Sequence, residues 1–468
     1  MHSTDEPLTA SARDGAVPAR VLALLRRHGW NATSFQVLED GFQYWFDGDQ
    51  ASSEACVAYV DTGSAWVAAG APIGPADHVT EVARRFAEAA AAQRRRALFF
   101  ATEARFSARS ALRTMLIGEQ PVWDPKAWEQ TVAAVSSLRA QLARAQRKGV
   151  TVRAVRPDEI ATPDQPLRRS IAALAARWLA SRPMAPMGFL VDVQLFAFAA
   201  ERRCFVAERG GAVVGFLGAV PVYARGGWLF EDLLRDAGAP NGTAELLIDA
   251  AMRAVAAEGS HYVTLGLAPL AGDVPGWLGL ARRLSSAFYD FAGVHSFRAR
   301  LRPQRWDPIY LSAAVSGRSP AVVDVTALLD ALRAFARGRF FRFGIATMLR
   351  GPALVVRVLA ALLIPWTALL ALAGERFFPE RGVHTAWVIF DVLLALALFR
   401  LAARWRRALA VALAVTITTD AALTALQVLL FNLPRVRTVS EALVLALGIA
   451  APTGAAVILW HGVGHRRA

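Results

Sequence analysis

The chain has 468 residues, 55% of them hydrophobic, and a formal net charge of +14. Its length accommodates two or three domains, and its mean hydropathy of +0.33 indicates a membrane part. The two cysteines, Cys56 and Cys204, lie in unrelated contexts, which excludes a disulfide framework and gives no metal-ligand spacing. A basic soluble part beside a membrane favours an anionic lipid surface or a nucleic acid as its partner.

The first part of the chain shows an order of strands, helix and strand that is typical of an α+β unit. Residues 1–16 are polar, lack the hydrophobic core of a secretory signal and are predicted to be a disordered tail. The predicted elements that follow are a helix over 17–28, strands over 42–46, 55–60 and 65–69, a helix over 78–94 and a strand over 97–101. We assign residues 17–150 to this first unit.

The first unit ends in a long predicted helix, 124–149, whose last turns are rich in cations. These cations are Arg139, Arg144, Arg147 and Lys148. The helix dipole favours cations near a helix C-terminus, so a solvated helix face explains them. A surface that binds phosphate groups explains them equally well, and both interpretations stay open.

The same order of elements then occurs a second time. The predicted elements are a helix over 167–181, strands over 204–208, 212–220 and 227–233, a helix over 244–258 and a strand over 262–266. We assign residues 151–316 to this second unit. The chain therefore predicts two α/β units in tandem, which repeat an architecture and not a sequence.

The densest run of unusual polar residues lies between 229 and 310. Asp232 and Arg235 are three apart at the end of a predicted strand, and a turn over 239–243 leads into a helix. Asn241 or Thr243 in that turn is predicted to cap the helix and to leave backbone N–H groups facing an anionic or carbonyl group. The alternative is that Asp232 and Arg235 form an exposed ion pair of little energetic value.

From residue 317 the chain changes character. Residues 317–350 are a basic juxtamembrane linker, with a predicted interfacial helix over 331–350. Its arginines are Arg333, Arg337, Arg339, Arg342 and Arg350. Four apolar spans are predicted within 351–462, over 353–373, 385–399, 408–431 and 442–460.

The arginines outside the spans predict an orientation. They are concentrated before the first span, between the second and third spans and at the C-terminus, which makes these segments and the soluble part cytoplasmic by the positive-inside rule. Asp391 and Asp420 lie within predicted spans, where a transport role is one reading. We favour helix packing or a position near the interface for both, because the spans hold no matching charged partner.

Several sequence motifs, which follow one another in the order found in a known protein family, resemble the motifs of that family. They are GWNATSF, WVAAGAPIG, DLLRDAGAPNGTAELL, LGLAPLAG and FYDFAGVHSFRARLRPQRWDPIY. Over residues 17–316 the chain is similar to the catalytic domain of the phosphatidylglycerol lysyltransferases, also called multiple peptide resistance factors. The resemblance implies two tandem acyltransferase-like (GNAT-type) units, the second of them catalytic, and no cofactor.

The resemblance also implies a reaction. An aminoacyl group passes from a charged tRNA to the glycerol hydroxyl of phosphatidylglycerol in the inner leaflet, and the product lipid weakens attack by cationic peptides. The implied location is the bacterial inner membrane, with a multi-pass anchor and a cytoplasmic soluble part. Four spans follow the catalytic part here, whereas the family commonly has a multi-helix flippase before it, so such a flippase is expected to be absent. Arginines also stand at Arg298 and Arg300, where the family commonly has lysines.

On this basis we assign roles to candidate site residues. Asp232 is expected to bind the ammonium of the aminoacyl group, and Arg235 to hold a phosphate or to orient Asp232. The turn residues Asn241, Gly242 and Thr243 are expected to face the ester or a phosphate. The remaining candidates are Arg298, Arg300 and Arg305 for the lipid phosphate or the tRNA 3′ end, Tyr289, Asp307 and Tyr310 for lining or bracing the site, and Arg139, Arg144, Arg147 and Lys148 for tRNA phosphates.

Two other functions remain open. An acyl-CoA-dependent N-acyltransferase acting on a membrane amine keeps the fold, although residues 239–243 do not match the Gly-rich pyrophosphate loop of such enzymes. A non-enzymatic membrane protein could instead bind anionic lipids through its arginines. A lysyl donor would require a second acidic group deep in the pocket and an alanyl donor a small apolar end, and the sequence locates neither.

Overall fold

The computed structural model describes residues 10–11, 16–50, 52–181, 189–191, 193–285, 291–314, 320–336, 352–372, 378, 381–403, 406–436 and 438–464. The chain divides into two compact units. The first contains Met1–Arg182 and Pro186–Phe340, and the second contains Pro183–Ala185 and Phe341–Ala468. Each unit is described separately below.

Within its described residues, the first unit contains a 13-stranded sheet in the order β1-β2-β3-β4-β5-β13-β6-β11-β10-β9-β8-β7, with β12 paired to β6. The strands are β1 (Ala10–Ser11), β2 (Gln43–Phe46), β3 (Cys56–Asp61), β4 (Ala65–Ala69), β5 (Arg96–Glu103), β6 (Arg113–Trp123), β7 (Thr151–Val155), β8 (Arg203–Arg209), β9 (Ala212–Val222), β10 (Gly227–Arg235), β11 (Tyr262–Thr264), β12 (Ala268–Pro269) and β13 (Arg305–Ala313). Strand β1 pairs with β2 and lies within the tail that was predicted to be disordered.

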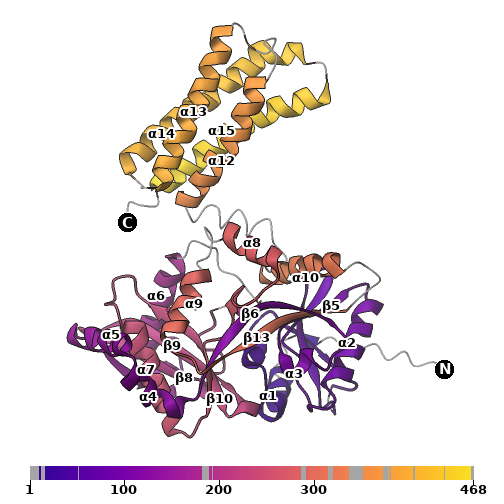
Figure 1. Cartoon of the computed structure of the whole chain (residues 1–468), viewed down its shortest axis with the longest axis vertical. Helices are drawn as coiled ribbons and strands as arrows, with labels where there is room; N and C mark the ends of the chain where they lie inside the picture. Colours follow the sequence, from indigo (N-terminus) through magenta and orange to yellow (C-terminus); the bar gives the residue numbers. More distant parts are fainter. Residues whose placement is uncertain are drawn as a thin grey trace, which may run out of the picture. The chain divides into compact units, whose positions relative to one another are not determined.

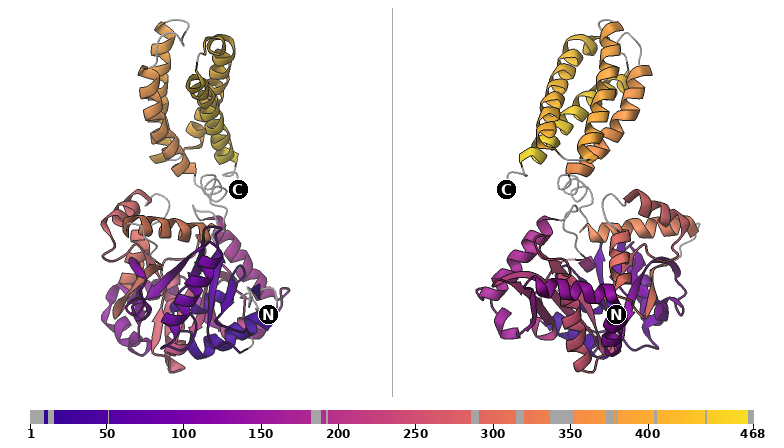
Figure 2. Two further views of the ribbon diagram at one scale, coloured as in Figure 1. Left: turned by 90° about the vertical axis from the view of Figure 1, so that its right-hand side faces the viewer. Right: turned by 60° about the vertical axis from the view of Figure 1, so that its left-hand side comes forward.

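Helices cover this sheet (Figures 1 and 2). The α-helices are α1 (Ala16–His28), α2 (Val79–Ala92), α3 (Ala104–Ser107), α4 (Trp128–Ala134), α5 (Ser136–Arg147), α6 (Pro166–Ala180), α7 (Thr243–Ala257), α8 (Gly276–Ser285), α9 (Phe291–Arg300) and α10 (Pro320–Phe335). The short 3-10 helices are η1 (Ala32–Leu38), η2 (Pro125–Ala127), η3 (Pro157–Ile160), η4 (Phe189–Val191), η5 (Ala199–Glu201) and η6 (Tyr223–Arg225).

The predicted order of elements is present in both halves. Strand β2 pairs antiparallel with β3, and β3 pairs antiparallel with β4. Helix α2 follows, and β5 then pairs parallel with β4. Strands β8, β9 and β10 are likewise antiparallel, α7 follows, and β11 pairs parallel to β10. A parallel neighbour requires a crossover connection, and the helix supplies it in each half.

The two halves are joined at the centre of the sheet by β13. This last strand pairs antiparallel with both β5 and β6, and β6 in turn pairs with β11. Strands from the two halves therefore alternate where the halves meet. Because strands from both halves belong to one sheet, the boundary between two units that we predicted at residues 150 and 151 remains a prediction.

The helices are held against the sheet by apolar residues that recur at the spacing of a helix. Helix α2 buries Val79, Val82 and Phe86, and the Phe86 ring contacts the rings of Tyr59 and Phe99 on the sheet. Its buried positions recur every three to four residues, which is the period of an amphipathic helix. Helix α7 packs in the same way on the second half, against β8, β9 and β10.

Two predicted helices have different bounds. The helix predicted over 124–149 is broken at Val135, whose backbone is extended (φ −102°, ψ 97°), so that η2, α4 and α5 replace it. The interfacial helix predicted over 331–350 is replaced over 331–335 by the end of α10, which begins much earlier, at Pro320. Residues 337–350 lie outside the described residues.

The second unit is helical, with α12 (Pro352–Leu372), α13 (Arg381–Ala403), α14 (Arg407–Gln427) and α15 (Val439–Gly464). Helix α14 continues through a π-helical turn, Val428–Asn432, and a 3-10 turn, Leu433–Arg435. Among the described residues, three segments are long and apolar enough to cross a membrane: Gly382–Ala402, Arg407–Arg435 and Glu441–Val463. Val356–Ala368 in α12 is a shorter apolar segment, so the fourth span remains a prediction.

Candidate functional site

Asp232 lies in a buried group of charged side chains, the Arg202 cluster, which also contains Glu39, Arg202 and Glu231. Arg202 Nη1 lies 2.8 Å from Glu231 Oε2 and 3.5 Å from Asp232 Oδ2, and Arg202 Nη2 lies 3.6 Å from Glu39 Oε1. Neighbouring residues of a strand normally point to opposite faces. The register of β10 shifts between Phe230 and Asp232, and this bulge accounts for both carboxyl groups reaching one guanidinium.

The Arg202 cluster has more acids than bases. Three carboxyl groups surround one guanidinium, and the side chains of Arg202 and Glu39 are only 1% and 2% exposed. Burial and the neighbouring Glu231 raise the pKa of Glu39 to about 10, and the same causes raise the pKa of Asp232 well above its ordinary value.

Several atoms of the Arg202 cluster also lack hydrogen bonds. Both Glu39 carboxylate oxygens, Glu231 Oε1, Asp232 Oδ2 and Arg202 Nη2 are buried without a hydrogen-bond partner among the described residues. A buried polar atom without a partner is costly. A cationic group such as an ammonium would supply hydrogen-bond donors to these carboxyl oxygens.

The Arg202 cluster predicts a pH dependence. A carboxyl group whose pKa is raised on folding stabilises the folded state fully below its ordinary pKa, and this contribution is lost as the pH rises through the folded value. For Glu39 these limits are 4.5 and about 10, so we expect the thermal stability of the full chain to fall between pH 5 and pH 9. Glu39→Gln should reduce this slope, as measured by thermal unfolding in detergent.

The matched control for Glu39→Gln is Glu258→Gln, because Glu258 is an exposed partner of Arg203. The control should retain the pH slope of the unmodified protein. Parallel curves for Glu39→Gln and the unmodified protein would contradict the raised pKa of Glu39.

A second group of charges, the Arg225 cluster, contains Glu103, Arg225, Arg305 and Asp307. Arg225 Nη1 lies 2.7 Å from Glu103 Oε2, and its Nη2 lies 3.4 Å from Asp307 Oδ2. Arg305 Nε lies 2.8 Å from the other oxygen of Asp307. Two arginines therefore hold Asp307 in place, and the choice between a bracing and a catalytic role for it stays open. Arg305 itself is 55% exposed and accessible to a ligand.

The segment from Trp30 to Glu39 touches both clusters. Arg225 lies 5.1 Å from the centroid of the Trp30 ring, and the Ala32 backbone N–H donates to Glu103 Oε1 over 3.3 Å. Farther along, Arg202 lies 5.7 Å from the centroid of the Phe35 ring, and Glu39 belongs to the Arg202 cluster. The run GWNATSF thus connects the two clusters.

The predicted link between Asp232 and Arg235 is wrong. Arg235 Nη1 donates to Asn241 Oδ1 over 3.2 Å, and no ion pair joins Arg235 to Asp232, both of which the structure describes. Arg202, which is 30 residues before Asp232 in the sequence, contacts the carboxyl group that Arg235 was expected to orient, while the phosphate role expected of Arg235 stays a prediction. The exposed ion pair considered as an alternative is absent for the same reason.

The predicted cap of α7 is also wrong. Gly242 occupies the cap position with φ +95°, and no side chain caps the helix there. The Thr243 hydroxyl is buried and donates to the Pro240 carbonyl over 2.7 Å. A Cβ atom on Gly242 would lie 2.1 Å from the Gln141 carbonyl oxygen, so the turn packs tightly against α5, beside which α7 lies (Figure 1). The start of α7 is therefore packed against α5 at Gly242, whereas Asn241 is exposed, and the expected contact of this turn with an ester or a phosphate stays a prediction.

Gly242→Ala is expected to destabilise the protein by about 3 kcal/mol, because it adds a clash with Gln141 to the strain of a positive φ. Gly259→Ala is the matched control, since Gly259 has φ +87° but open space around it. It should cost only about 1 kcal/mol. Denaturant unfolding of both variants tests this difference, and equal losses would show that packing against α5 contributes nothing.

Two further candidates bind backbone carbonyl groups. Arg298 donates to the carbonyls of Leu265 and Gly266 over 2.6 and 3.0 Å, and so anchors α9 to the segment after β11. Arg139 donates to the Val132 and Ala133 carbonyls at the end of α4, where the helix is broken. These hydrogen bonds at the helix end explain the position of the Arg139 side chain without a phosphate ligand.

The remaining candidates are placed as follows. Arg300 is exposed at the end of α9, and Arg144, Arg147 and Lys148 are exposed at the end of α5. Tyr310 is half-buried on β13, and its carbonyl accepts a hydrogen bond from Thr102. Tyr289 lies outside the described residues.

Sequence reasoning missed the partners of Asp232 and Asp307. Glu231 could have been found, because it directly precedes Asp232. Glu39, Glu103, Arg202 and Arg225 stand in unremarkable sequence contexts, and only the folded sheet brings them to the two aspartates.

A family model described as the C-terminal part of phosphatidylglycerol lysyltransferase matches residues 22–313, which is more than half of the chain. The chain belongs to the phosphatidylglycerol lysyltransferase family. The resemblance predicted from the sequence motifs is thereby confirmed. No curated protein sequence matches this lysyltransferase-family chain.

Solved structures agree on the fold of this lysyltransferase-family protein. The C-terminal domain (DUF2156) of an Agrobacterium fabrum protein assigned as a lysylphosphatidylglycerol synthetase is 22% identical, with a TM-score of 0.59, over 69% of this chain and 98% of that one. The structure of L-PGS from Bacillus licheniformis is 21% identical, with a TM-score of 0.57, over 68% of this chain and 97% of that one.

Membership of the lysyltransferase family defines the class of reaction. It makes the protein a transferase related to lipid aminoacylation, with phosphatidylglycerol as the acceptor that the family description names. The apolar helices of the second unit make it a membrane protein.

Proposed function

We propose that this protein transfers an aminoacyl group from a charged tRNA to the glycerol hydroxyl of phosphatidylglycerol in the inner leaflet. The observation that carries the proposal is the Arg202 cluster, in which three buried carboxyl groups share one guanidinium inside a lysyltransferase-family domain. An ammonium entering this cluster would favour the ionised forms of Glu39 and Asp232, whose pKa values burial raises. Asp232 receives the ammonium of the aminoacyl group in this proposal.

A lysyl donor fits the Arg202 cluster best. Lysyl groups carry two ammonium groups, and we noted that such a donor needs a second acidic group deep in the site. Glu39 and Glu231 are two such groups beside Asp232. A donor with a small apolar side chain would leave this excess of carboxyl groups unmatched.

The reaction requires few chemical groups because the aminoacyl ester is already activated. The glycerol oxygen attacks the ester carbonyl carbon, the bond to the ribose oxygen of the tRNA breaks, and the proton of the glycerol hydroxyl ends on that ribose oxygen. The protein must align the two substrates and stabilise the oxyanion that forms between these steps. We assign the lipid phosphate to Arg305, which Asp307 orients, with Arg300 as a second cation.

The donor and its location follow from the distribution of cations. Exposed Arg144, Arg147 and Lys148 at the end of α5 supply phosphate contacts for a tRNA. The arginines between the second and third spans favour a cytoplasmic soluble domain on a bacterial inner membrane, by the positive-inside rule. The element order that occurs twice supports two tandem acyltransferase-like units.

The acyl-CoA alternative is disfavoured by the start of α7. In such enzymes a pyrophosphate binds to backbone N–H groups before the long helix. Here the corresponding turn packs against α5 at Gly242.

The experiment is to express the chain in a bacterial host that makes no aminoacylated lipid and to identify new lipids by mass. We expect phosphatidylglycerol heavier by one lysyl group. In membranes prepared from these cells, ribonuclease treatment of the added charged tRNA should abolish product formation. No new ninhydrin-positive lipid, or product formation that survives ribonuclease, would contradict the proposal.

A further inference from the structure

Helix α10 of the first unit presents an apolar stripe to its surroundings. Val322, Val325, Leu329 and Leu332 are spaced three, four and three residues apart, so they lie on one side of the helix. Each is between 41% and 46% exposed. Exposed apolar residues aligned in this way mark an interaction surface rather than scattered surface residues.

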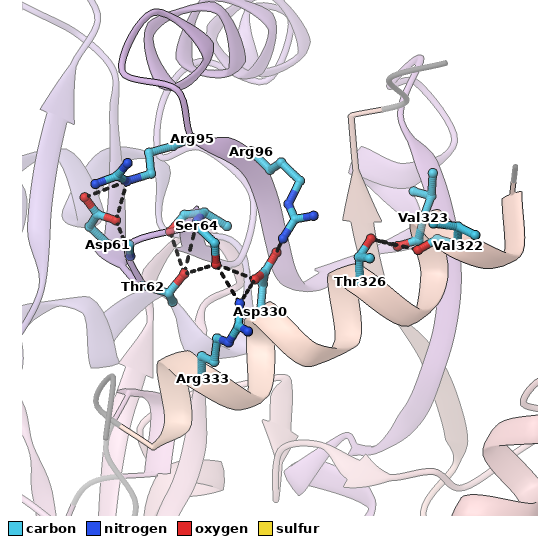
Figure 3. A network of polar contacts seen from close by, with 12 residues as sticks. Asp61, Thr62, Ser64, Arg95, Arg96, Val322, Val323, Thr326, Asp330 and Arg333 are labelled. Carbon is cyan, nitrogen blue, oxygen red and sulfur yellow. Dashed lines mark hydrogen bonds and ion pairs between the residues drawn. The ribbon is translucent and has the colours of Figure 1, made fainter. Parts of the chain in front are cut away.

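The opposite side of α10 is fixed to the domain by buried ion pairs. Asp330 accepts hydrogen bonds from Ser64 (2.7 Å), Arg96 (2.5 Å) and Arg333 (3.1 Å), as Figure 3 shows. Six residues before Asp330 in the sequence, Asp324 accepts two hydrogen bonds of 2.7 and 2.6 Å from Arg113. These contacts hold α10 in one rotation about its axis, and the stripe therefore has a fixed outward direction.

The stripe is bordered by positive charge. Arg333, which pairs with Asp330 but is 48% exposed, is the one charged residue with an exposed side chain on the described helix, because Asp324 and Asp330 are buried. The sequence that follows, 331–350, contains Arg337, Arg339, Arg342 and Arg350 and no acidic residue. An apolar stripe with cations beside it matches a membrane surface rich in anionic headgroups.

The covalent chain keeps a bilayer within reach of the stripe. Helix α10 ends at Phe335 and the next helix, α12, begins at Pro352. The residues between them span at most about 55 Å when fully extended. The second unit contains helices that are suited to crossing a membrane. Every copy of the protein therefore has a bilayer available to this stripe.

We propose that α10 docks on an anionic bilayer surface through Val322, Val325, Leu329 and Leu332. The helix lies along the membrane interface and fixes the rotation of the first unit relative to the bilayer. This inference goes beyond the proposed function and holds whichever group the protein transfers. The spacing of the stripe also suits a helix from a second copy of the chain, and the experiment distinguishes the two partners.

The test uses the full chain in liposomes that contain phosphatidylglycerol. An environment-sensitive fluorophore is attached to Val325→Cys or Leu329→Cys, and to Ala91→Cys on α2 as the matched control, since Ala91 is also exposed and helical. Cys56 and Cys204 are buried, and the unmodified chain gives the labelling background. Quenching by spin-labelled lipid and by aqueous iodide is then compared.

We expect the two α10 labels to be quenched by spin-labelled lipid and to be at least about fivefold less accessible to iodide than the control label, as for a helix at the interface. Replacing Val325 and Leu329 by Glu should remove lipid quenching of a label at Val322→Cys. Iodide accessibility equal to that of Ala91→Cys would overturn the proposal. Protection from iodide without lipid quenching, together with a disulfide-linked dimer of Leu329→Cys, would overturn it in favour of a second copy.

Discussion

Asp232→Asn is expected to lower aminoacyl-lipid formation by about 100-fold, a loss typical of removing one partner of a buried charged pair. Its effect on stability should be small. Burial raises the pKa of Asp232 well above its ordinary value and so favours the protonated form, whose shape Asn reproduces. The measurements are lipid product per unit of membrane protein and the midpoint of thermal unfolding.

Asp236→Asn is the control for this variant. Asp236 follows β10 directly and pairs with Arg177 at the surface, so its loss should leave product formation within about twofold, as for an exposed ion pair. Unchanged product from Asp232→Asn would remove Asp232 from the site. A large loss of stability together with activity would instead show that the carboxyl group has a structural role.

Arg202→Met is expected to destabilise the first unit by about 3–5 kcal/mol at neutral pH, because it leaves the carboxyl groups of Glu39, Glu231 and Asp232 buried without a cation. The pKa values of Glu39 and Asp232, which burial already raises, then rise further in the folded state. The folded protein then binds more protons than the unfolded chain, so its stability falls more steeply as the pH rises. Denaturant unfolding at pH 5 and pH 8 should show the smaller loss at pH 5.

The adjacent residue provides a matched control. Arg203→Met removes an arginine that is exposed and paired with Glu258, and it should cost less than about 1 kcal/mol at either pH. Adding Glu231→Gln to Arg202→Met should recover part of the lost stability. Equal losses for Arg202→Met and Arg203→Met would contradict the description of a buried cluster with excess acid.

Local sequence pattern was sufficient for much of the fold. The stripe of α2 and the short apolar runs that became β3, β4 and β8 have the periods of their structures, and all were predicted within a few residues. The central strands β6 and β13 were not predicted. Strand β13 contains the dipeptide Asp307-Pro308, which is common in turns, and the pairing of β13 with β5 depends on residues far away in the sequence.

The site was predictable only in part. Asp232 could be identified from its motif, but its partners could not, since Glu39 and Arg202 reach it through long-range packing. The choice of Arg235 failed because β10 is regular from Asp232 to Arg235, and side chains three residues apart on a regular strand point to opposite faces. Gly242 was chosen as part of a ligand-facing turn, and the structure adds a packing reason for a glycine there, because Gln141 of α5 leaves no space for a side chain.

The position of β13 has a consequence for biosynthesis. Thr102 on β5 and Tyr310 on β13 contact each other although 208 residues separate them. A nascent chain therefore holds β5 and β6 without their shared neighbour until the ribosome has passed residue 313 and is translating the segment before α12. Completion of the sheet is therefore followed closely in translation by the helices of the second unit. A chain that stops before β13 leaves one edge of β5 and one edge of β6 without a partner, and we expect it to aggregate rather than to fold as a soluble half.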